Sequence, residues 1–293
     1  KTYMKYLALL LGGALAFTAC SKDDSENAGM DGSTPAVKRK YDYISKIAMT
    51  TGPEFTSLYV DSFTYDNQMR LIGVKSYLPY GNPRVDMNGK AAFSKDEYKF
   101  EKQDYSYYSG LYLRWSSSLT LDHRGKASEY LFVVYTPYNT TTGKRFETIS
   151  KYDSLKYNSE GHLESCYCHL YNWKVSNIWE NGNLVSFSHN FHDDPPGVTR
   201  YQFHYTNIPN RSYPDLNLYY LMFRPFQHSM CFYSDELGLR SSKMTSEFTE
   251  SYNGKINDRY KISYKLDKKG RPIELLRESA HDTAYKFLIT YVD

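Results

Sequence analysis

Cysteine is scarce in this sequence of 293 residues. Apart from Cys20, the chain contains only Cys166, Cys168 and Cys231. An odd set of three excludes a fold stapled by several disulfides. Cys231 has two alternative partners for a single bridge. Cys166 and Cys168, two apart on one expected strand, are poorly placed to bridge each other.

Runs of one charge are also missing. Lys and Arg number 36, Asp and Glu number 33, and both signs are interspersed along the chain. A nucleic-acid-binding domain normally concentrates its basic residues in a patch or stripe. We therefore expect no nucleic-acid partner.

The local motifs of the common enzyme classes are absent from the sequence. There is no Gly-x-Ser-x-Gly elbow, His-Glu-x-x-His motif, phosphate loop or dinucleotide fingerprint. Only the paired carboxylates of a glycoside hydrolase would leave no local pattern, because they come from distant strands. We expect a chain without catalytic residues or cofactors, and the alternative is a surface glycoside hydrolase or peptidase.

Two short segments contain residues that ligate metals, but neither has the spacing of a metal site. Residues 166–169 read Cys-Tyr-Cys-His, in a strand pattern that points His169 away from both thiols. Residues 189–194 contain two His and two Asp and precede Pro195-Pro196-Gly197, as a hairpin tip would. Zinc needs four converging ligands, so we predict buried thiols, a polar loop and no metal.

No apolar run is long enough for a stable membrane span. Residues 6–19 are uncharged and rich in Leu, and Lys1 and Lys5 precede them. As a helix this run spans about 21 Å, whereas the hydrocarbon core of a bilayer is about 30 Å thick. A positive start followed by a short apolar centre predicts a secretory signal peptide over residues 1–19.

A cysteine ends this apolar run. Phe17-Thr18-Ala19-Cys20 resembles the lipobox of bacterial lipoproteins, which implies a diacylglycerol on the Cys20 sulfur and cleavage before this residue. Lys22, Asp23 and Asp24 follow and are similar to the lipoprotein export signal of Bacteroides-type bacteria. The resemblance implies an anchor in the outer membrane and display on its outer face, with the periplasmic face as the alternative.

Residues 25–37 are rich in Gly, Ser, Pro and acids. Such a composition buries too little apolar surface to fold and behaves as a linker. We therefore predict a lipidated cysteine and flexible tether over 20–40, followed by a single β-rich domain over 41–293.

Tyrosine is the residue in excess, with 31 copies among the 293 residues. Tyrosine favours pleated, half-buried surfaces, where its ring packs and its hydroxyl stays in water. The composition predicts a β protein with broad, partly solvated sheet faces.

A degenerate hairpin recurs along the chain. Apolar residues alternate on both sides of a turn in which Asp or Asn precedes Gly by three positions. This pattern is typical of a type I turn with a bulge, because Asx bonds nearby amides and Gly adopts positive φ. The copies are 63–71, 119–127, 155–163 and 264–272, and Asn181-Gly182 and Asn253-Gly254 predict two shorter hairpins.

These repeats predict an all-β fold, a curved antiparallel meander of hairpins. In the first copy Met69 stands where the others have Gly, so we expect a different turn or a strained one. Residues 207–237 interrupt the pattern with three prolines, and Asp215 is placed to cap a helix over 215–222. We predict a loop-and-helix insert that covers an end or one face of the sheet.

The hairpins, together with Tyr205-Thr206-Asn207, Asn210 and residues 238–243, resemble a Bacteroides-type lipoprotein family of unknown function. The likeness covers most of residues 45–293. The hairpins are also similar to the tyrosine-aspartate repeats of large bacterial surface and toxin shells. The resemblance implies a location and a fold, and it brings no catalytic residues.

One row of side chains is a candidate ligand surface. Every second residue of this segment has an aromatic or imidazole ring, and in an extended strand these rings lie on the face opposite the two cysteines. They are Tyr167, His169, Tyr171 and Trp173. Rings with polar edges can stack on sugars, but packing against neighbouring elements is the interpretation we favour. The predicted function is a non-catalytic binding or structural module at the cell surface, with a glycan or a protein as ligand.

Overall fold

The structure is a computed structural model that describes residues 40–51, 56–77, 86–93, 97–106, 111–135, 147–169, 172–191, 197–221, 231–281 and 284–293. All of these belong to one compact unit, residues 39–293. Within this part of the chain, no helix is both long and apolar enough to cross a membrane.

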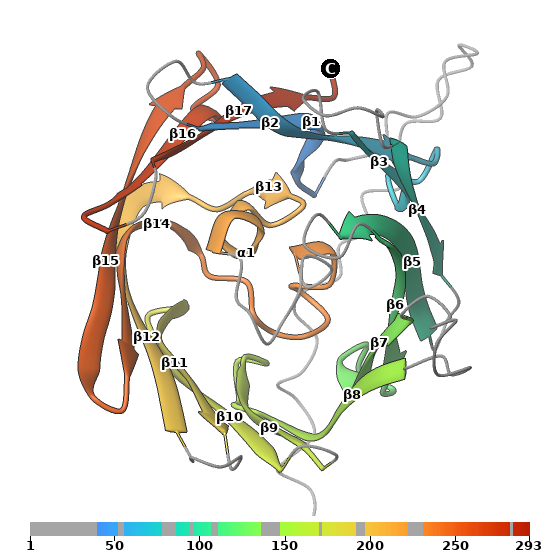
Figure 1. Cartoon of the computed structure of the whole chain (residues 1–293), viewed down its shortest axis with the longest axis vertical. Helices are drawn as coiled ribbons and strands as arrows, with labels where there is room; N and C mark the ends of the chain where they lie inside the picture. The colour runs from blue at the N-terminus through green and yellow to red at the C-terminus, as the bar shows by residue number, and fades with distance from the viewer. Residues whose placement is uncertain are drawn as a thin grey trace, which may run out of the picture. The chain divides into compact units, whose positions relative to one another are not determined.

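The described residues form seventeen strands and one short helix (Figure 1). The strands are β1 (Asp42–Thr51), β2 (Thr56–Tyr65), β3 (Leu71–Tyr77), β4 (Asp86–Phe93), β5 (Glu97–Ser106), β6 (Leu111–Leu121), β7 (Ala127–Tyr135), β8 (Glu147–Tyr157), β9 (Leu163–Cys168), β10 (Trp173–Glu180), β11 (Asn183–Phe191), β12 (Gly197–Pro209), β13 (Ser212–Tyr213), β14 (Lys243–Tyr252), β15 (Lys255–Leu266), β16 (Pro272–Ser279) and β17 (Tyr285–Tyr291). The helix is α1 (Leu216–Leu221).

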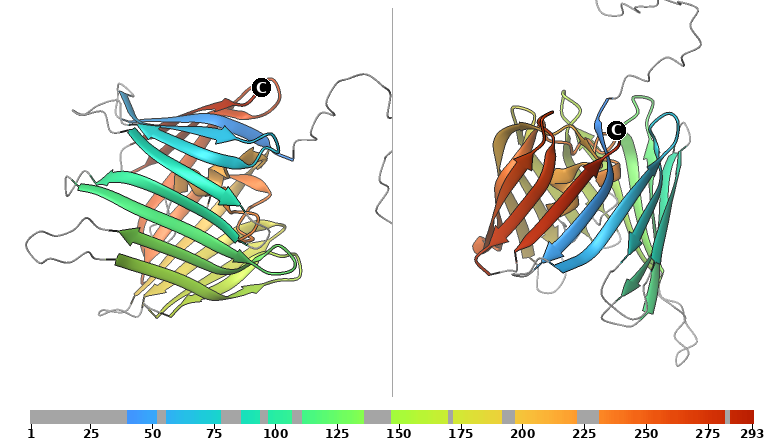
Figure 2. Two further views of the ribbon diagram at one scale, coloured as in Figure 1. Left: turned by 90° about the vertical axis from the view of Figure 1, so that its right-hand side faces the viewer. Right: turned by 90° about the horizontal axis from the view of Figure 1, so that it is seen from above.

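The strands form an antiparallel meander that closes on itself (Figures 1 and 2). Apart from β13, each strand pairs with the next along the chain, and β12 pairs with β14 across the insert. Ile47 of β1 lies opposite Asp61 of β2 on one side and Ile289 of β17 on the other, which joins the first strand to the last. The two-residue β13 pairs with β1 in parallel. The predicted meander is confirmed, and its closure, which the sequence left open, is resolved.

Strand faces alternate between a packed interior and a charged exterior. In β15, Ile262 is buried and Tyr260 and Tyr264 are partly buried, whereas Lys261 and Lys265 are exposed. The exposed positions of other strands are polar in the same way, as at Lys75, Lys151, Glu164, Lys174, Arg200 and Gln202. One polar and one apolar face is the pattern of an antiparallel sheet with water on one side.

The interior of the ring is filled by one hydrophobic cluster in which aromatic rings are prominent. It collects side chains from strands all around the ring and from the insert. Its largest fully buried members are Tyr130, Tyr152, Tyr220, Tyr233, Phe187 and Phe287.

The composition predicted tyrosine hydroxyls that stay in water, but many of them lie inside the protein. Five of them donate hydrogen bonds of 2.6–2.8 Å to backbone carbonyls inside the protein. The donors are Tyr65, Tyr157, Tyr205, Tyr264 and Tyr291. A buried hydroxyl needs such a partner, and burial raises the pKa of Tyr291 to about 12. Tyrosine is abundant here because it fills the interior with rings and also satisfies carbonyl groups at irregular strand ends.

The Asx turns are confirmed at all four predicted copies. In each, the side-chain oxygen of Asp or Asn accepts the backbone N–H groups two and four residues later, at 2.8–3.0 Å. The fourth position has positive φ in every copy, and at Met69 φ is 60°. The first turn therefore keeps the common geometry and forces a methionine into the left-handed region. Asn181-Gly182 and Asn253-Gly254 also have the positive φ values of tight hairpins.

We expect Met69→Gly to stabilise the protein by about 0.5–1 kcal/mol, because glycine removes the strain of positive φ. Gly125 occupies the equivalent position with φ 74°, and a Cβ added there would have no heavy atom within 4 Å. Gly125→Ala should therefore destabilise by about 1 kcal/mol through backbone strain alone. Urea denaturation of the two variants measures both effects, and shifts of the same sign would contradict the shared turn geometry.

The described residues of the predicted insert, with β13 and α1, come between β12 and β14 in the chain and lie inside the ring (Figure 1). Asp215 caps α1, since its side chain accepts the N–H of Asn217 at 3.0 Å. The Tyr219 ring meets Phe63 of β2 and Phe287 of β17, each at 6.4 Å between centroids. The insert therefore fills the interior of the ring, rather than lying over the outside of the sheet.

The insert is fastened to several turns at one end of the ring. Backbone hydrogen bonds of 2.9 Å join Ala127 N–H to Glu236, Leu163 N–H to Gly238, and Ser242 N–H to Gly182. Alternate connections of an antiparallel meander fall at the same end, so the Asx turns gather here with the start of β1 and the end of β17. We call this the turn end.

Candidate functional site

The predicted lipidation and export residues lie outside the described residues. Cys20, Lys22, Asp23 and Asp24 all precede residue 40, where the described chain begins. Their roles remain predictions.

The predicted aromatic row is not one continuous face. Tyr167 and His169 come together, with ring centroids 4.5 Å apart, and His169 Nε2 lies 2.9 Å from Asp153 Oδ1. Strand β9 ends at Cys168, however, and the chain turns before β10 begins. Trp173 lies opposite Cys168 in the β9–β10 pair, and Tyr171 lies outside the described residues.

Trp173 packs against the interior cluster. Its ring meets His189, which is fully buried, edge to face at 5.1 Å. The expected alternation through residue 173 is therefore corrected. A turn reverses the chain between the cysteines and Trp173, so this ring faces the same side as Cys168.

The three cysteines that the structure describes are buried, and no disulfide joins any two of them. Burial raises the pKa of the Cys166 thiol, which disfavours the thiolate that binds metals and attacks electrophiles. Across the described residues, no three His, Cys, Asp or Glu side chains converge as a metal site would require.

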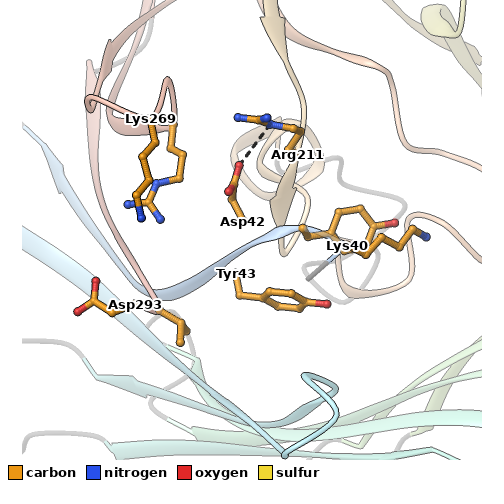
Figure 3. A pocket seen from close by; sticks show the side chains of 9 residues that line it. Lys40, Asp42, Tyr43, Arg211, Lys269 and Asp293 are labelled. Atoms are coloured by element: carbon orange, nitrogen blue, oxygen red, sulfur yellow. Dashed lines mark ion pairs between the residues drawn. The ribbon is translucent and has the colours of Figure 1, made fainter. Parts of the chain in front are cut away.

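A pocket of about 290 Å³ opens at the turn end (Figure 3). It is built where the start of β1 meets the β15–β16 turn, the loop before β13 and the end of the chain. Its lining residues are Lys40–Tyr43, Arg211, Lys269, Arg271, Val292 and Asp293.

The lining is positively charged overall, with four cationic side chains and two aspartates. Arg211 Nε lies 3.4 Å from Asp42, and Arg271 Nε lies 2.7 Å from Asp267. Lys269 has no ion-pair partner among the described side chains, and Figure 3 shows it on the other side of the Asp42–Arg211 pair from Lys40. A free ammonium beside positioned guanidinium groups is suited to a carboxylate or sulfate.

An aromatic wall holds one side of the pocket in place. The Tyr41 ring stacks on Tyr213 at 5.9 Å, and its hydroxyl donates to Asp235 Oδ2 at 2.7 Å. The Arg240 guanidinium lies 4.6 Å from the centre of the same ring. Burial and the Asp235 carboxylate raise the pKa of Tyr41, so this hydroxyl stays protonated and keeps its hydrogen bond.

The pocket can bind an anion but has few groups for catalysis. No Ser, Thr, Cys or His is among the described residues that line it, so a nucleophile with an imidazole base is lacking. One of its two aspartates, Asp42, is engaged by Arg211. Positioned cations and tyrosine rings remain, and positioned cations are groups that can hold a carboxylate or sulfate.

No local sequence pattern marks this pocket, because its residues come from four distant segments. Only Lys40 belongs to a visible local feature, because it is the last of the three consecutive basic residues 38–40. The recurring turn that places Lys269 and Arg271 was predictable, but its position beside β1 depends on closure of the sheet.

The comparisons with known proteins establish a likeness of fold. No protein-family model and no curated protein matches the chain. A solved porin-like protein from Bacteroides uniformis is 14% identical with a TM-score of 0.51, and the match covers 87% of this chain and 100% of that one. A porin-like protein from Bacteroides vulgatus is also 14% identical, with a TM-score of 0.56 and coverage of 86% and 99%.

Proposed function

We propose that this chain is a lipid-anchored binding protein of the bacterial cell envelope that holds an acidic glycan at its turn end. The observation that carries the proposal is the pocket of Lys40, Arg211, Lys269 and Arg271 beside the Tyr41 and Tyr43 rings. The cations suit the carboxylate or sulfate of an acidic sugar.

The size of the pocket favours a sugar unit over a protein surface. Its volume of about 290 Å³ lies just below the range for sites that hold drug-sized ligands. A stable protein partner would need about 800 Å² of complementary surface on each side. One ring of a glycan chain fits the observed hollow, while the rest of that chain extends into solvent.

The packed interior favours binding over passage of a solute. The structural neighbours are described as porin-like, yet the described residues of this chain place a hydrophobic cluster rich in aromatic side chains, together with α1 of the insert, inside the ring. Its described outer positions carry Lys, Arg and Glu, with exposed apolar side chains such as Ile178, Ile256 and Leu288 among them. Scattered apolar residues are ordinary on a surface in water, so this mixture suits a domain surrounded by water. The Bacteroides origin of the neighbours and the lipobox-like Cys20 support an envelope location, with display on the outer face as our proposal and the periplasmic face as the alternative.

A glycan array tests this function with the purified protein. We expect binding to uronate-containing or sulfated glycans and much weaker binding to neutral glycans of the same linkage. The signal should fall as salt rises, because exposed charges are screened. Equal binding to acidic and neutral partners, or none to either, would exclude the proposed ligand class.

Lys269→Ala should weaken binding of the best acidic glycan about fivefold, which corresponds to about 1 kcal/mol for one exposed ionic contact. The matched control is Lys255→Ala, at the opposite end of β15 and outside the pocket. Isothermal titration of both variants measures the difference. Equal losses in the two would show that general surface charge, and not this pocket, attracts the ligand.

A further inference from the structure

A second pocket, of about 250 Å³, lies at the turn end where the insert meets the turns of β6–β7, β8–β9 and β10–β11. Lys126, Asn210, Ser234, Asp235, Arg240 and Ser241 are among its lining residues. Its walls are backbone and short polar side chains, fixed by the hydrogen bonds that dock the insert.

Four buried polar atoms of this lining have no hydrogen-bond partner among the described residues. They are His162 Nδ1, which lies 3.4 Å from Glu160 Oε2, and Asn210 Oδ1, Ser234 Oγ and Arg240 Nη2. Asn210 is 5% exposed and Ser234 is 1% exposed. Buried polar atoms in folded proteins are nearly always paired, so four around one hollow point to groups that meet a ligand.

The hydrogen bonds around these atoms explain why these particular atoms have no partner. The Asn210 amide nitrogen donates to Asp215 Oδ1 at 3.0 Å and to the Ser241 carbonyl at 3.1 Å, which leaves its oxygen unused. Arg240 Nε donates to Asp235 at 3.2 Å and its Nη1 to the Ser212 carbonyl at 2.9 Å. The lining therefore presents a fixed acceptor, a fixed donor and a hydroxyl that serves as either.

The charges of this pocket balance, unlike those of the first pocket. Lys126 and Arg240 are matched by Glu160 and Asp235. Burial lowers the pKa of His162, which also lines the pocket, and so favours its neutral form. A ligand with alternating donors and acceptors and no net charge suits this lining.

We propose that the second pocket binds a neutral, hydroxyl-bearing unit, a single sugar ring or a polyol of that size. The two pockets share a wall, because Tyr41 lines the first and its hydroxyl donates to Asp235 of the second at 2.7 Å. If the proposed function holds, neighbouring acidic and neutral units of one glycan occupy the two pockets. Binding of a neutral unit in the second pocket is independent of that function.

The test is an NMR titration of the isotope-labelled protein with methyl glycosides of glucose, galactose, mannose and N-acetylglucosamine. We expect saturable shifts at the amides of Gly161, Gly182 and Gly238 with at least one of them. Unmoved amides throughout the panel, or shifts that grow linearly without saturation, would overturn the proposal.

Ser234→Ala supplies the second readout, because the Ser234 hydroxyl has no partner among the described residues and its loss should leave folding intact. We expect affinity for the bound glycoside to fall about fivefold, with Ser128→Ala on the outer face of β7 as an unaffected control. An unchanged affinity in Ser234→Ala would also overturn the proposal. A titration with glucuronate, followed through the amide shifts of Tyr41, Tyr43 and Arg271, tests the first pocket separately. The proposal for either pocket can therefore be refuted without the other.

Discussion

Gly238→Val should detach the insert from the turn end and cost more than about 4 kcal/mol of folding free energy. Gly238 has φ 63°, and a Cβ at this position would lie 2.4 Å from the Gly161 carbonyl oxygen and 3.0 Å from the Leu163 nitrogen. Both neighbours are backbone atoms of the β8–β9 hairpin, which cannot move without breaking the Leu163–Gly238 hydrogen bond. Losses of this size mark a disrupted core or docking contact.

The matched control is Gly254→Val, in the β14–β15 turn. Its φ is 80°, and no heavy atom lies within 4 Å of its Cβ position. Backbone strain alone should then cost about 1–3 kcal/mol. Urea denaturation of both variants separates strain from the close approach, and equal midpoints would show that the insert does not depend on Gly238.

Cys20→Ala should abolish incorporation of labelled palmitate, because the thioether anchor requires the cysteine sulfur. Replacing Lys22, Asp23 and Asp24 with alanine should leave labelling intact and reduce cleavage of the protein by protease added to whole cells. The two variants therefore separate lipidation from export. Labelling that persists without Cys20 would refute the anchor, and unchanged cleavage in the triple variant would refute the export signal.

Local features of the fold were predictable from the sequence because each is decided within a few residues. The same kind of turn occurs four times, because each copy needs only one side-chain oxygen and the backbone amides of the next four residues. The residues that supply this oxygen are Asp66, Asp122, Asn158 and Asp267. The helix cap at Asp215 is local in the same sense.

Long-range features were not predictable. Closure of the sheet depends on β1 pairing with β17, whose partners Ile47 and Ile289 lie far apart in the sequence. Judged by their hydrophobic pattern alone, several other strands could pair with β1 equally well. The first pocket follows from that closure, because the start of β1 and the two residues before it contribute Lys40–Tyr43, and the β15–β16 turn contributes Lys269 and Arg271.

The aromatic row failed for a different reason. Cys166 to Trp173 alternates by composition, but Asn172 has φ 54° and marks a turn within the pattern. Asparagine tolerates this conformation better than most residues, so Asn172 was the available signal. The alternation of polar and apolar residues continues through this turn, so the sequence pattern alone cannot show that the chain reverses direction there.

The location of the ligand is tested most directly by a crystal structure of the protein with the acidic glycan that binds best on the array. We predict that its carboxylate or sulfate lies beside Lys269 and Arg271, within the first pocket. A glycan bound instead over Tyr167 and His169, with the turn-end pocket unaltered, would contradict the proposed site.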